Sequence, residues 1–337
     1  MNNKPSINNN DKYSICIFLC WFGQVPPYYP AWRKTVLKNS SIDFYIFTDQ
    51  EAIVSENNIS VTHISFDELR ELFQSKFSFQ IVLDKPYKLC DYKPAYGYIF
   101  REITRKYAYW GYCDMDMVFG DIRKYITNEI LDNYLRLFVT GFFNINKSNK
   151  QMILLFKNNG KYPEYNYKEV YSTDDACYFD EFRGMEPKCY RNNIDIFKSS
   201  DEVVYSQYKQ GFYNSSGESV LLKWEKGKLF ECTISGKKRE ILLAHFHDRA
   251  MKCEHVLGDT FYMTQNSITN YLPEMTSYTP IQEKKYKWRF YYRRMNKKIN
   301  SKGYLHFIKM QIRRKQIEKY TQVIKKKCLK PKDLSVG

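Results

Sequence analysis

The segment SICIFLCWF, residues 14–22, is a continuous apolar run. Such a run is typical of a parallel strand that is buried on both faces of its sheet. It is far shorter than the ~20 apolar residues that a membrane-spanning helix needs. The residues before it are polar and Asn-rich, and no small-residue cleavage site follows. We therefore expect a buried strand and no export signal, preceded by a disordered leader at residues 1–11.

Strand and helix patterns alternate along the chain after this segment. The expected helices cover residues 31–38, 66–77 (with Asp67 as N-cap) and about 91–107, and the expected strands cover 42–49, 59–64 and 108–113. This order predicts an α/β domain with a mostly parallel central sheet. In such sheets, ligands bind at the carboxyl ends of the strands.

The pattern is less regular in the second half of the chain. Residues 135–146 indicate a strand pair or a strand and turn, and residues 148–158 indicate a helix. The segment KREILLAHFHD, residues 238–248, is expected to be the last strand and runs into His245 and His247.

The net charge of +16 is concentrated at the carboxyl end. Residues 284–337 hold 19 of the 53 basic side chains and two of the 37 acidic ones, a balance of +17. The remainder has 34 basic and 35 acidic side chains, a net of −1. We therefore expect a main domain at 12–282 and a basic, aromatic-rich helical tail at 283–337.

The cysteines indicate a reducing compartment. The chain has nine, an odd number, and no Cys-x-x-Cys pair. This argues against both a zinc site and a complete disulfide framework. We therefore expect a cytoplasmic protein.

The most informative segment is YWGYCDMDMVFGDI, residues 109–122, in which an apolar strand ends at Asp114 and Asp116. Alternate residues of an extended segment project to the same side, so both carboxylates can face one ligand. Two adjacent negative charges repel unless a cation lies beside them. A hard divalent cation, Mg²⁺ or Mn²⁺, that bridges to a diphosphate satisfies this requirement. Solvated loop acids are the alternative explanation for an Asp-x-Asp pair standing alone.

A second polar group precedes the helix expected at about 91–107. Lys88 and Lys93 can neutralise phosphate, and with Asp91 they stand where a helix start offers free backbone N–H groups to an anion. A surface loop with Asp91 as N-cap explains the same residues.

Three segments together resemble a poorly characterised family of bacterial GT-A-fold glycosyltransferase-like proteins associated with polysaccharide biosynthesis. They are PYKLCDYKPAYG (86–97), YWGYCDMDMVFGDI (109–122) and LLAHFHDRAMK (242–252). The resemblance covers residues 12–255. It implies a Rossmann-like nucleotide-sugar-binding domain and a hexosyltransferase that uses a UDP-sugar and Mn²⁺ or Mg²⁺.

The resemblance also implies roles for single residues. Asp114 and Asp116 hold the donor through the metal, and a late His completes the metal shell, with His245 preferred over His247. Asp49, at the end of its predicted strand, corresponds to a contact with the base or ribose. Arg249 is a candidate for the diphosphate.

An acidic cluster at residues 174–181 is the candidate acceptor site. Asp180 and Glu181 resemble an acidic pair of related proteins, and one of them can be the general base that inversion requires. Asp174 and Asp175 are better explained as helix N-terminal acids favoured by the helix dipole. Gly141, after a predicted strand, is either an ordinary turn residue or lets a sugar approach the backbone.

The expected function is sugar transfer from the nucleotide-sugar donor to a glycan or lipid-linked acceptor in surface polysaccharide synthesis. Cations interleaved with aromatics at 284–330 either bind an anionic membrane, which places the enzyme on the inner face of the cell membrane, or form a solvated helix packed on the body. The alternative function is a nucleic-acid-binding protein that acts through the tail. A metal-dependent phosphoryl-transfer enzyme or nuclease is a third explanation.

Overall fold

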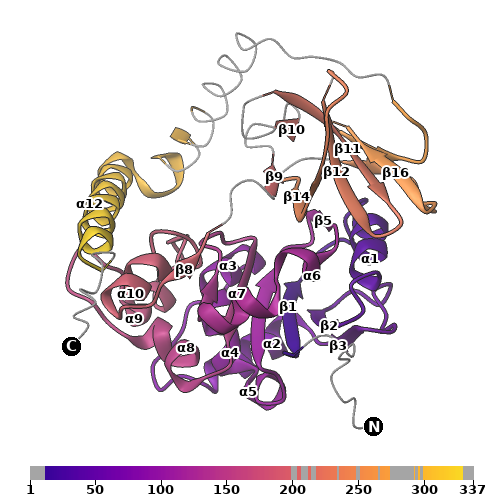
Figure 1. The fold of residues 1–337 in the computed structure, drawn as a ribbon. Coiled ribbons are helices and arrows are strands. Elements are labelled where there is room, and N and C mark those ends of the chain that lie inside the picture. Colours follow the sequence, from indigo (N-terminus) through magenta and orange to yellow (C-terminus); the bar gives the residue numbers. More distant parts are fainter. Residues whose placement is uncertain are drawn as a thin grey trace.

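A computed structural model describes most of the chain. The described residues are 12–198, 203–205, 212–213, 218–233, 235–247, 251–264, 266–273, 292, 295–296 and 299–328. They form two β-sheets with helices around the first, and a long helix follows near the carboxyl end (Figure 1).

The first sheet has seven strands in the order β3-β2-β1-β4-β7-β6-β8. Its strands are β1 (Ile15–Trp21), β2 (Ile42–Thr48), β3 (Ile59–His63), β4 (Tyr109–Cys113), β6 (Arg136–Leu137), β7 (Phe143–Lys147) and β8 (Ile196–Phe197). The strands β3, β2, β1 and β4 pair in parallel, and β7 runs antiparallel to both β4 and β6. The predicted α/β fold with a mostly parallel sheet is therefore confirmed.

The central strand β1 is buried because strands flank both of its edges and helices cover both of its faces. Ile15, Ile17 and Leu19 pack into one core with α1, while Cys16 and Phe18 pack into a second core with α2. This two-sided burial explains the continuous apolar run, since successive side chains of a strand point to opposite faces.

The helices expected at 31–38, 66–77 and 148–158 lie near those positions, the second and third of them shorter than expected, and further short helices were not predicted. The helices up to residue 191 are α1 (Tyr29–Leu37), α2 (Phe66–Gln74), α3 (Leu89–Tyr92), α4 (Tyr96–Ile99), α5 (Arg101–Thr104), α6 (Ile122–Tyr125), α7 (Asn128–Asn133), α8 (Lys150–Leu154), α9 (Tyr167–Tyr171) and α10 (Met185–Arg191), with 3-10 turns at Pro86–Lys88, Lys93–Ala95 and Leu155–Lys157. The N-cap of α2 is Ser65, which forms a capping box with Glu68, so the expectation of Asp67 was wrong.

The helix predicted over residues 91–107 is broken into short pieces. Pro94 lies inside it and has no N–H to donate to the preceding turn. Phe100 has φ −93° and ψ 38°, outside the helical region, and separates α4 from α5. The breaks fold this segment closely over the sheet, where Tyr92, Tyr96 and Phe100 are buried.

The second sheet is mixed and mostly antiparallel, in the order β15-β17-β16-β11-β10-β9-β14-β5, with β12 and β13 added beside β11. Its strands are β5 (Met117–Phe119), β9 (Val203–Tyr205), β10 (Phe212–Tyr213), β11 (Ser219–Glu225), β12 (Lys228–Thr233), β13 (Lys238–Ile241), β14 (Leu243–His245), β15 (Lys252–Cys253), β16 (Thr260–Met263) and β17 (Ser267–Thr269). The strand predicted at 238–248 is split into β13 and β14. It is not the last, because β15, β16 and β17 follow it.

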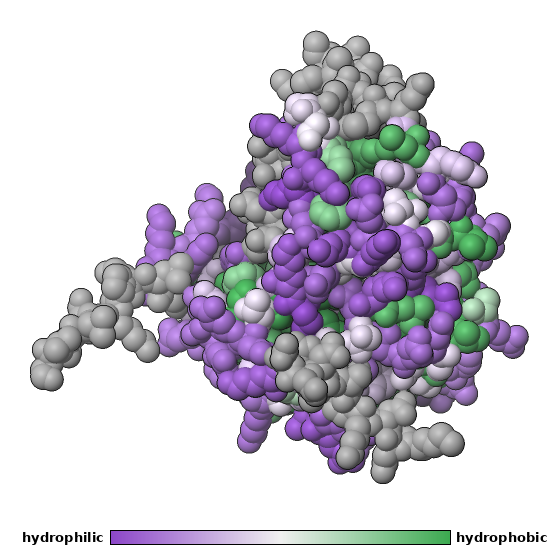
Figure 2. All heavy atoms as spheres, turned by 45° about the vertical axis from the view of Figure 1, so that its right-hand side comes forward, coloured by the Kyte–Doolittle hydropathy of each residue, from purple (hydrophilic) through white to green (hydrophobic). Residues whose placement is uncertain are grey.

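The helix α12 (Tyr304–Cys328) packs beside α10, on the side of the body opposite the second sheet (Figure 1). Its residue Ile317 is fully buried, and its Glu318 forms an ion pair with Arg183 at 2.9 Å. Within the described residues, the helices are too short or too polar to span a bilayer. Hydrophilic side chains cover most of the face in Figure 2, and hydrophobic ones gather only in small separate groups.

Candidate metal and donor site

The two aspartates of the Asp-x-Asp segment lie where the chain passes from one sheet to the other. Strand β4 of the first sheet ends at Cys113, and β5 of the second sheet begins at Met117. Met115 is fully buried between the two acids and anchors the bend, while both carboxylates remain partly exposed. Asp114 thus lies at the carboxyl end of a parallel strand, the edge at which ligands bind in α/β sheets.

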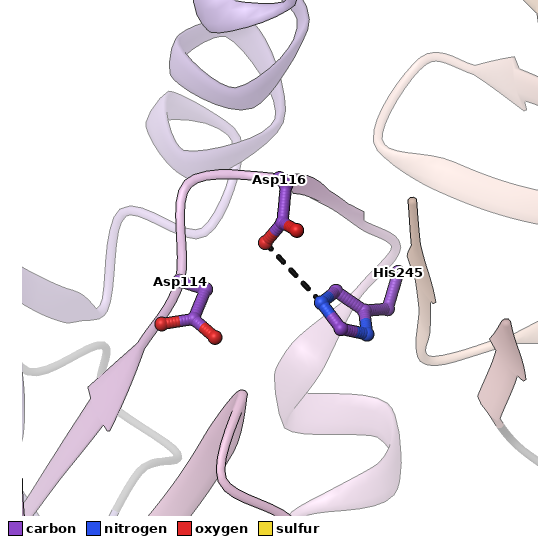
Figure 3. A group of neighbouring side chains, drawn as sticks. All are labelled: Asp114, Asp116 and His245. Carbon is purple, nitrogen blue, oxygen red and sulfur yellow. Dashed lines mark ion pairs between the residues drawn. The ribbon is translucent and has the colours of Figure 1, made fainter. Parts of the chain in front are cut away.

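His245 reaches the same place from a segment far away in the sequence. Strand β14 pairs antiparallel with β5 and places His245 opposite Met117. The Phe246 backbone N–H donates to the Asp116 carbonyl at 2.7 Å and fixes this register. His245 Nε2 lies 3.2 Å from Asp116 Oδ1, these two side chains point toward each other, and Asp114 lies beside them (Figure 3).

The three side chains can supply ligands to one metal ion. One ligand atom from each of Asp114, Asp116 and His245 lies within 4.8 Å of the other two. The two carboxylate oxygens suit the hard cations Mn²⁺ and Mg²⁺, and the imidazole nitrogen is a better ligand for Mn²⁺ than for Mg²⁺. The side chains of the aspartates are 31% and 20% exposed and that of His245 is 6% exposed, so the group is open on the carboxylate side.

The imidazole of His245 is held by ring packing. Its ring stacks on Phe142, with centroids 4.3 Å apart and planes 26° apart. The other nitrogen, Nδ1, is buried and has no hydrogen-bond partner among the described residues. The ring of His247 lies 4.9 Å from that of His245, and its left-handed backbone, φ 59°, departs from the strand alternation that would put both on one face.

The charges of the site are coupled. Burial raises the pKa of Asp114, and Asp116 adds to this rise while Lys93 opposes it. Burial also acts to raise the pKa of Asp116, but the nearby imidazole of His245 outweighs it and the pKa is lowered. For His245, burial favours the neutral form, yet the pairing with Asp116 prevails and raises the pKa.

Lys93 is buried and connects the metal-site acids to the acidic cluster. Its ammonium donates to Asp114 Oδ1 at 2.6 Å and to the Gly141 carbonyl at 2.7 Å. The same nitrogen lies 3.5 Å from Asp180 Oδ2. One cation therefore holds two carboxylates that are 66 positions apart in the sequence.

Asp180 is 3% exposed and packed tightly against residue 141. A Cβ added to Gly141 would lie 2.5 Å from Asp180 Oδ2, so glycine is required by this contact. Behind it, Arg136 donates to the Tyr112 hydroxyl, which donates to the Asp180 carbonyl at 3.2 Å. Burial raises the pKa of Asp180 well above its usual value, although Lys93 opposes this. Its neighbour Glu181 is partly exposed.

Lys88 and Asp91 form a separate buried pair that holds the loop after α9. Lys88 Nζ donates to Asp91 at 2.8 Å and to the carbonyls of Val170 and Asp175 at 2.9 and 2.6 Å. Asp91 in turn accepts from the backbone N–H groups of Cys177 and Phe179, both at 2.9 Å. Because all three protons of the Lys88 ammonium are engaged, this geometry favours a structural role for Lys88 over a phosphate contact.

The remaining predicted residues are spread around this edge. Asp49 is exposed just after β2 and accepts a hydrogen bond from Gln50 at 2.8 Å, at the same strand edge as Asp114. Arg249 lies outside the described residues. Asp174 and Asp175 follow the end of α9 and do not begin a helix. They pair with Lys302 at distances up to 3.6 Å, so explaining them as helix N-terminal acids was wrong.

Sequence reasoning missed the groups that support the site. No local pattern marks Phe142 as the ring that stacks on His245. Nor does one mark Arg136 as the donor behind Tyr112, because both contacts join segments that are separated in the sequence. The Gly141 carbonyl was also missed as the second acceptor of Lys93. The sequence signal available for this contact was the glycine itself.

The fold and site together define an α/β protein with a candidate divalent-metal centre at the carboxyl edge of its parallel strands. The chain belongs to the Family of unknown function (DUF6625), whose sequence model matches residues 17–275. This range contains the candidate metal ligands Asp114, Asp116 and His245. No curated protein matches the chain.

Proposed function

We propose that the protein is a metal-dependent glycosyltransferase that takes a sugar from a nucleotide-sugar donor, with a UDP-sugar preferred. The observation that carries this proposal is the convergence of Asp114, Asp116 and His245 at the junction of the two sheets. A bound Mn²⁺ or Mg²⁺ would neutralise the charge that develops on the departing nucleoside diphosphate.

The strand arrangement supports the GT-A resemblance. Parallel strands in the order β3-β2-β1-β4 form the half of the sheet that ends in Asp49 and Asp114. Ligands of open α/β sheets bind outside these carboxyl ends. We assign the nucleoside to the Asp49 side and the diphosphate to the metal side.

In this proposal, the protein residues position the acids around the donor. Lys93 keeps Asp114 in place and neutralises one charge of the acidic site. Asp180 fixes Lys93 from the opposite side, and its burial suits it to positioning. Glu181 is partly exposed on the same loop, so we assign it the role of general base, which accepts the proton of the acceptor hydroxyl.

The acceptor is proposed to be a glycan or lipid-linked sugar. The exposed side of α12 supports a membrane contact, since Leu305 and Ile312 are more than half exposed and Lys309 and Lys315 are exposed beside them. Such a helix binds an anionic surface through apolar contact and charge together. This contact would place the site on the inner face of the cell membrane.

The test is metal-dependent turnover of a panel of nucleotide sugars without acceptor. We expect one donor to bind and hydrolyse slowly with Mn²⁺ or Mg²⁺ and not with EDTA. Asp116→Asn should abolish turnover, whereas the matched change Asp84→Asn at an exposed acid should leave it intact. The proposal would be rejected if no nucleotide sugar were turned over in a metal-dependent way. It would also be rejected if Asp116→Asn turned over the donor as fast as Asp84→Asn.

A further inference from the structure

A cavity lies between the loop after α9 and the first half of α12, apart from the metal site. It has a volume of about 140 Å³ and includes Asp174, Asp175, Lys302, His306, Gln311 and Arg314 in its lining. The cavity exists because α12 packs across this loop, so it joins segments more than 120 residues apart.

The acidic wall of this cavity already has partners. Lys302 Nζ forms a close ion pair with Asp174 and lies 3.6 Å from Asp175 Oδ1. His306 Nε2 lies 2.9 Å from Asp175 Oδ2. Among the described residues, Arg314 is therefore the cation of the lining that has no acidic partner.

Arg314 is 8% exposed, and its guanidinium lies over the Tyr178 ring at 4.8 Å. Its Nε and Nη2 atoms are buried and have no hydrogen-bond acceptor in the described structure. These two nitrogens form one edge of the guanidinium, the edge that binds carboxylate or phosphate through two parallel hydrogen bonds. A buried guanidinium edge without acceptors is costly, so Arg314 favours an anion that can reach this edge.

We propose that this cavity binds a phosphate group, held by the Nε–Nη2 edge of Arg314. Rotation about the terminal side-chain torsions can present that edge to the cavity. Lys302 and Gln311 offer further donors on the cavity wall, which suits a tetrahedral anion with several free oxygens better than a planar carboxylate. The site is independent of the proposed glycosyl transfer, since none of its lining residues belongs to the metal group.

The phosphate can be free in solution or part of a lipid headgroup, and two measurements distinguish these sources. The first is the thermal midpoint of the full chain during titration with inorganic phosphate, in EDTA and at constant ionic strength. The second is co-sedimentation with phosphatidylglycerol vesicles compared with phosphatidylcholine vesicles. EDTA removes any effect that passes through a metal.

Arg314→Gln removes the guanidinium, and Arg314→Lys keeps the charge without the two-nitrogen edge. Arg101→Gln, at an exposed arginine of α5 and outside α12, is the matched control for charge. We expect phosphate to raise the midpoint of the native chain and of Arg101→Gln. Both Arg314 variants should bind about tenfold more weakly, or not at all.

For a lipid source, the native chain and Arg101→Gln should sediment with phosphatidylglycerol, and the Arg314 variants should sediment markedly less. The site is supported if either the phosphate-dependent rise of the midpoint or the vesicle binding is weakened in the Arg314 variants and not in the control. The proposal is overturned if the native chain shows neither a phosphate-dependent midpoint nor Arg314-dependent vesicle binding. It is also overturned if Arg314→Lys and Arg101→Gln both respond as the native chain does.

Discussion

Lys93 Nζ lies 2.6 Å from Asp114 Oδ1, so the first acid of the metal group is paired with a buried cation. Burial by itself would lower the pKa of Lys93, but Asp114 and its other acidic neighbours raise it well above the usual value. The lysine therefore stays charged. Its contact with Asp180 extends the same network to the candidate acceptor loop.

Replacement of Lys93 by Met should destabilise the fold strongly. The variant would leave Asp180 buried without its cation, and removal of one partner of a buried pair typically costs about 3–5 kcal/mol. The free energy of unfolding in urea measures this cost. Adding Asp180→Asn should recover part of it, and a double variant no more stable than Lys93→Met would contradict the network.

Gly141→Ala tests the contact between residue 141 and Asp180. The new methyl group would lie 2.5 Å from Asp180 Oδ2, and we expect a loss of about 1–3 kcal/mol in unfolding free energy. The same change made in an Asp180→Ala background should cost much less. Equal costs in the two backgrounds, measured as a double-mutant cycle, would show that the contact with Asp180 is not what requires glycine at position 141.

Lys88→Met separates the structural role of Lys88 from phosphate binding. Because its ammonium is spent on Asp91 and two backbone carbonyls, we expect a stability loss of about 3–5 kcal/mol. Donor affinity, measured by calorimetry on the folded protein, should stay within about twofold of the native value. A large loss of donor affinity with normal stability would instead support a phosphate contact.

Lys188 should make stability depend on pH in the alkaline range. Burial lowers its pKa from 10.5 to about 8, and Arg191 adds to the effect while Glu164 opposes it. Between these values the unfolded chain binds more protons than the folded one, so stability rises with pH by up to about 3 kcal/mol. Urea unfolding at pH 7.5 to 10.5 measures this rise. Lys188→Met should flatten it, and exposed Lys161→Met should not.

Local patterns were sufficient to predict the first half of the fold. The continuous apolar run of β1 and the alternating elements after it identified the parallel strands, because each signal lies within one segment. The broken helix at 91–107 was missed, since its apolar spacing masked the effect of Pro94. The second sheet was missed because its strands are short and pair across long sequence distances.

The candidate site was likewise predicted only in part. Asp114 and Asp116 were predicted because an apolar strand ends in two acids. His245 was chosen over His247 from the resemblance, and its place beside Asp116 comes from the pairing of β5 with β14. Lys88 and Lys93 looked equivalent in sequence, yet only Lys93 contacts the metal group. Such a difference depends on tertiary packing and leaves no local signal.

The central claim is that Asp114, Asp116 and His245 hold one divalent metal, and Mn²⁺ binding tests it most directly. Electron paramagnetic resonance titration, with UDP present, should give one bound Mn²⁺ per chain, since one such cluster occurs in the described residues. Asp116→Ala and His245→Ala should lose this ion while remaining folded, and the exposed control Asp84→Ala should keep it. Absence of binding by the native chain, or unchanged binding by Asp116→Ala and His245→Ala, would contradict the account.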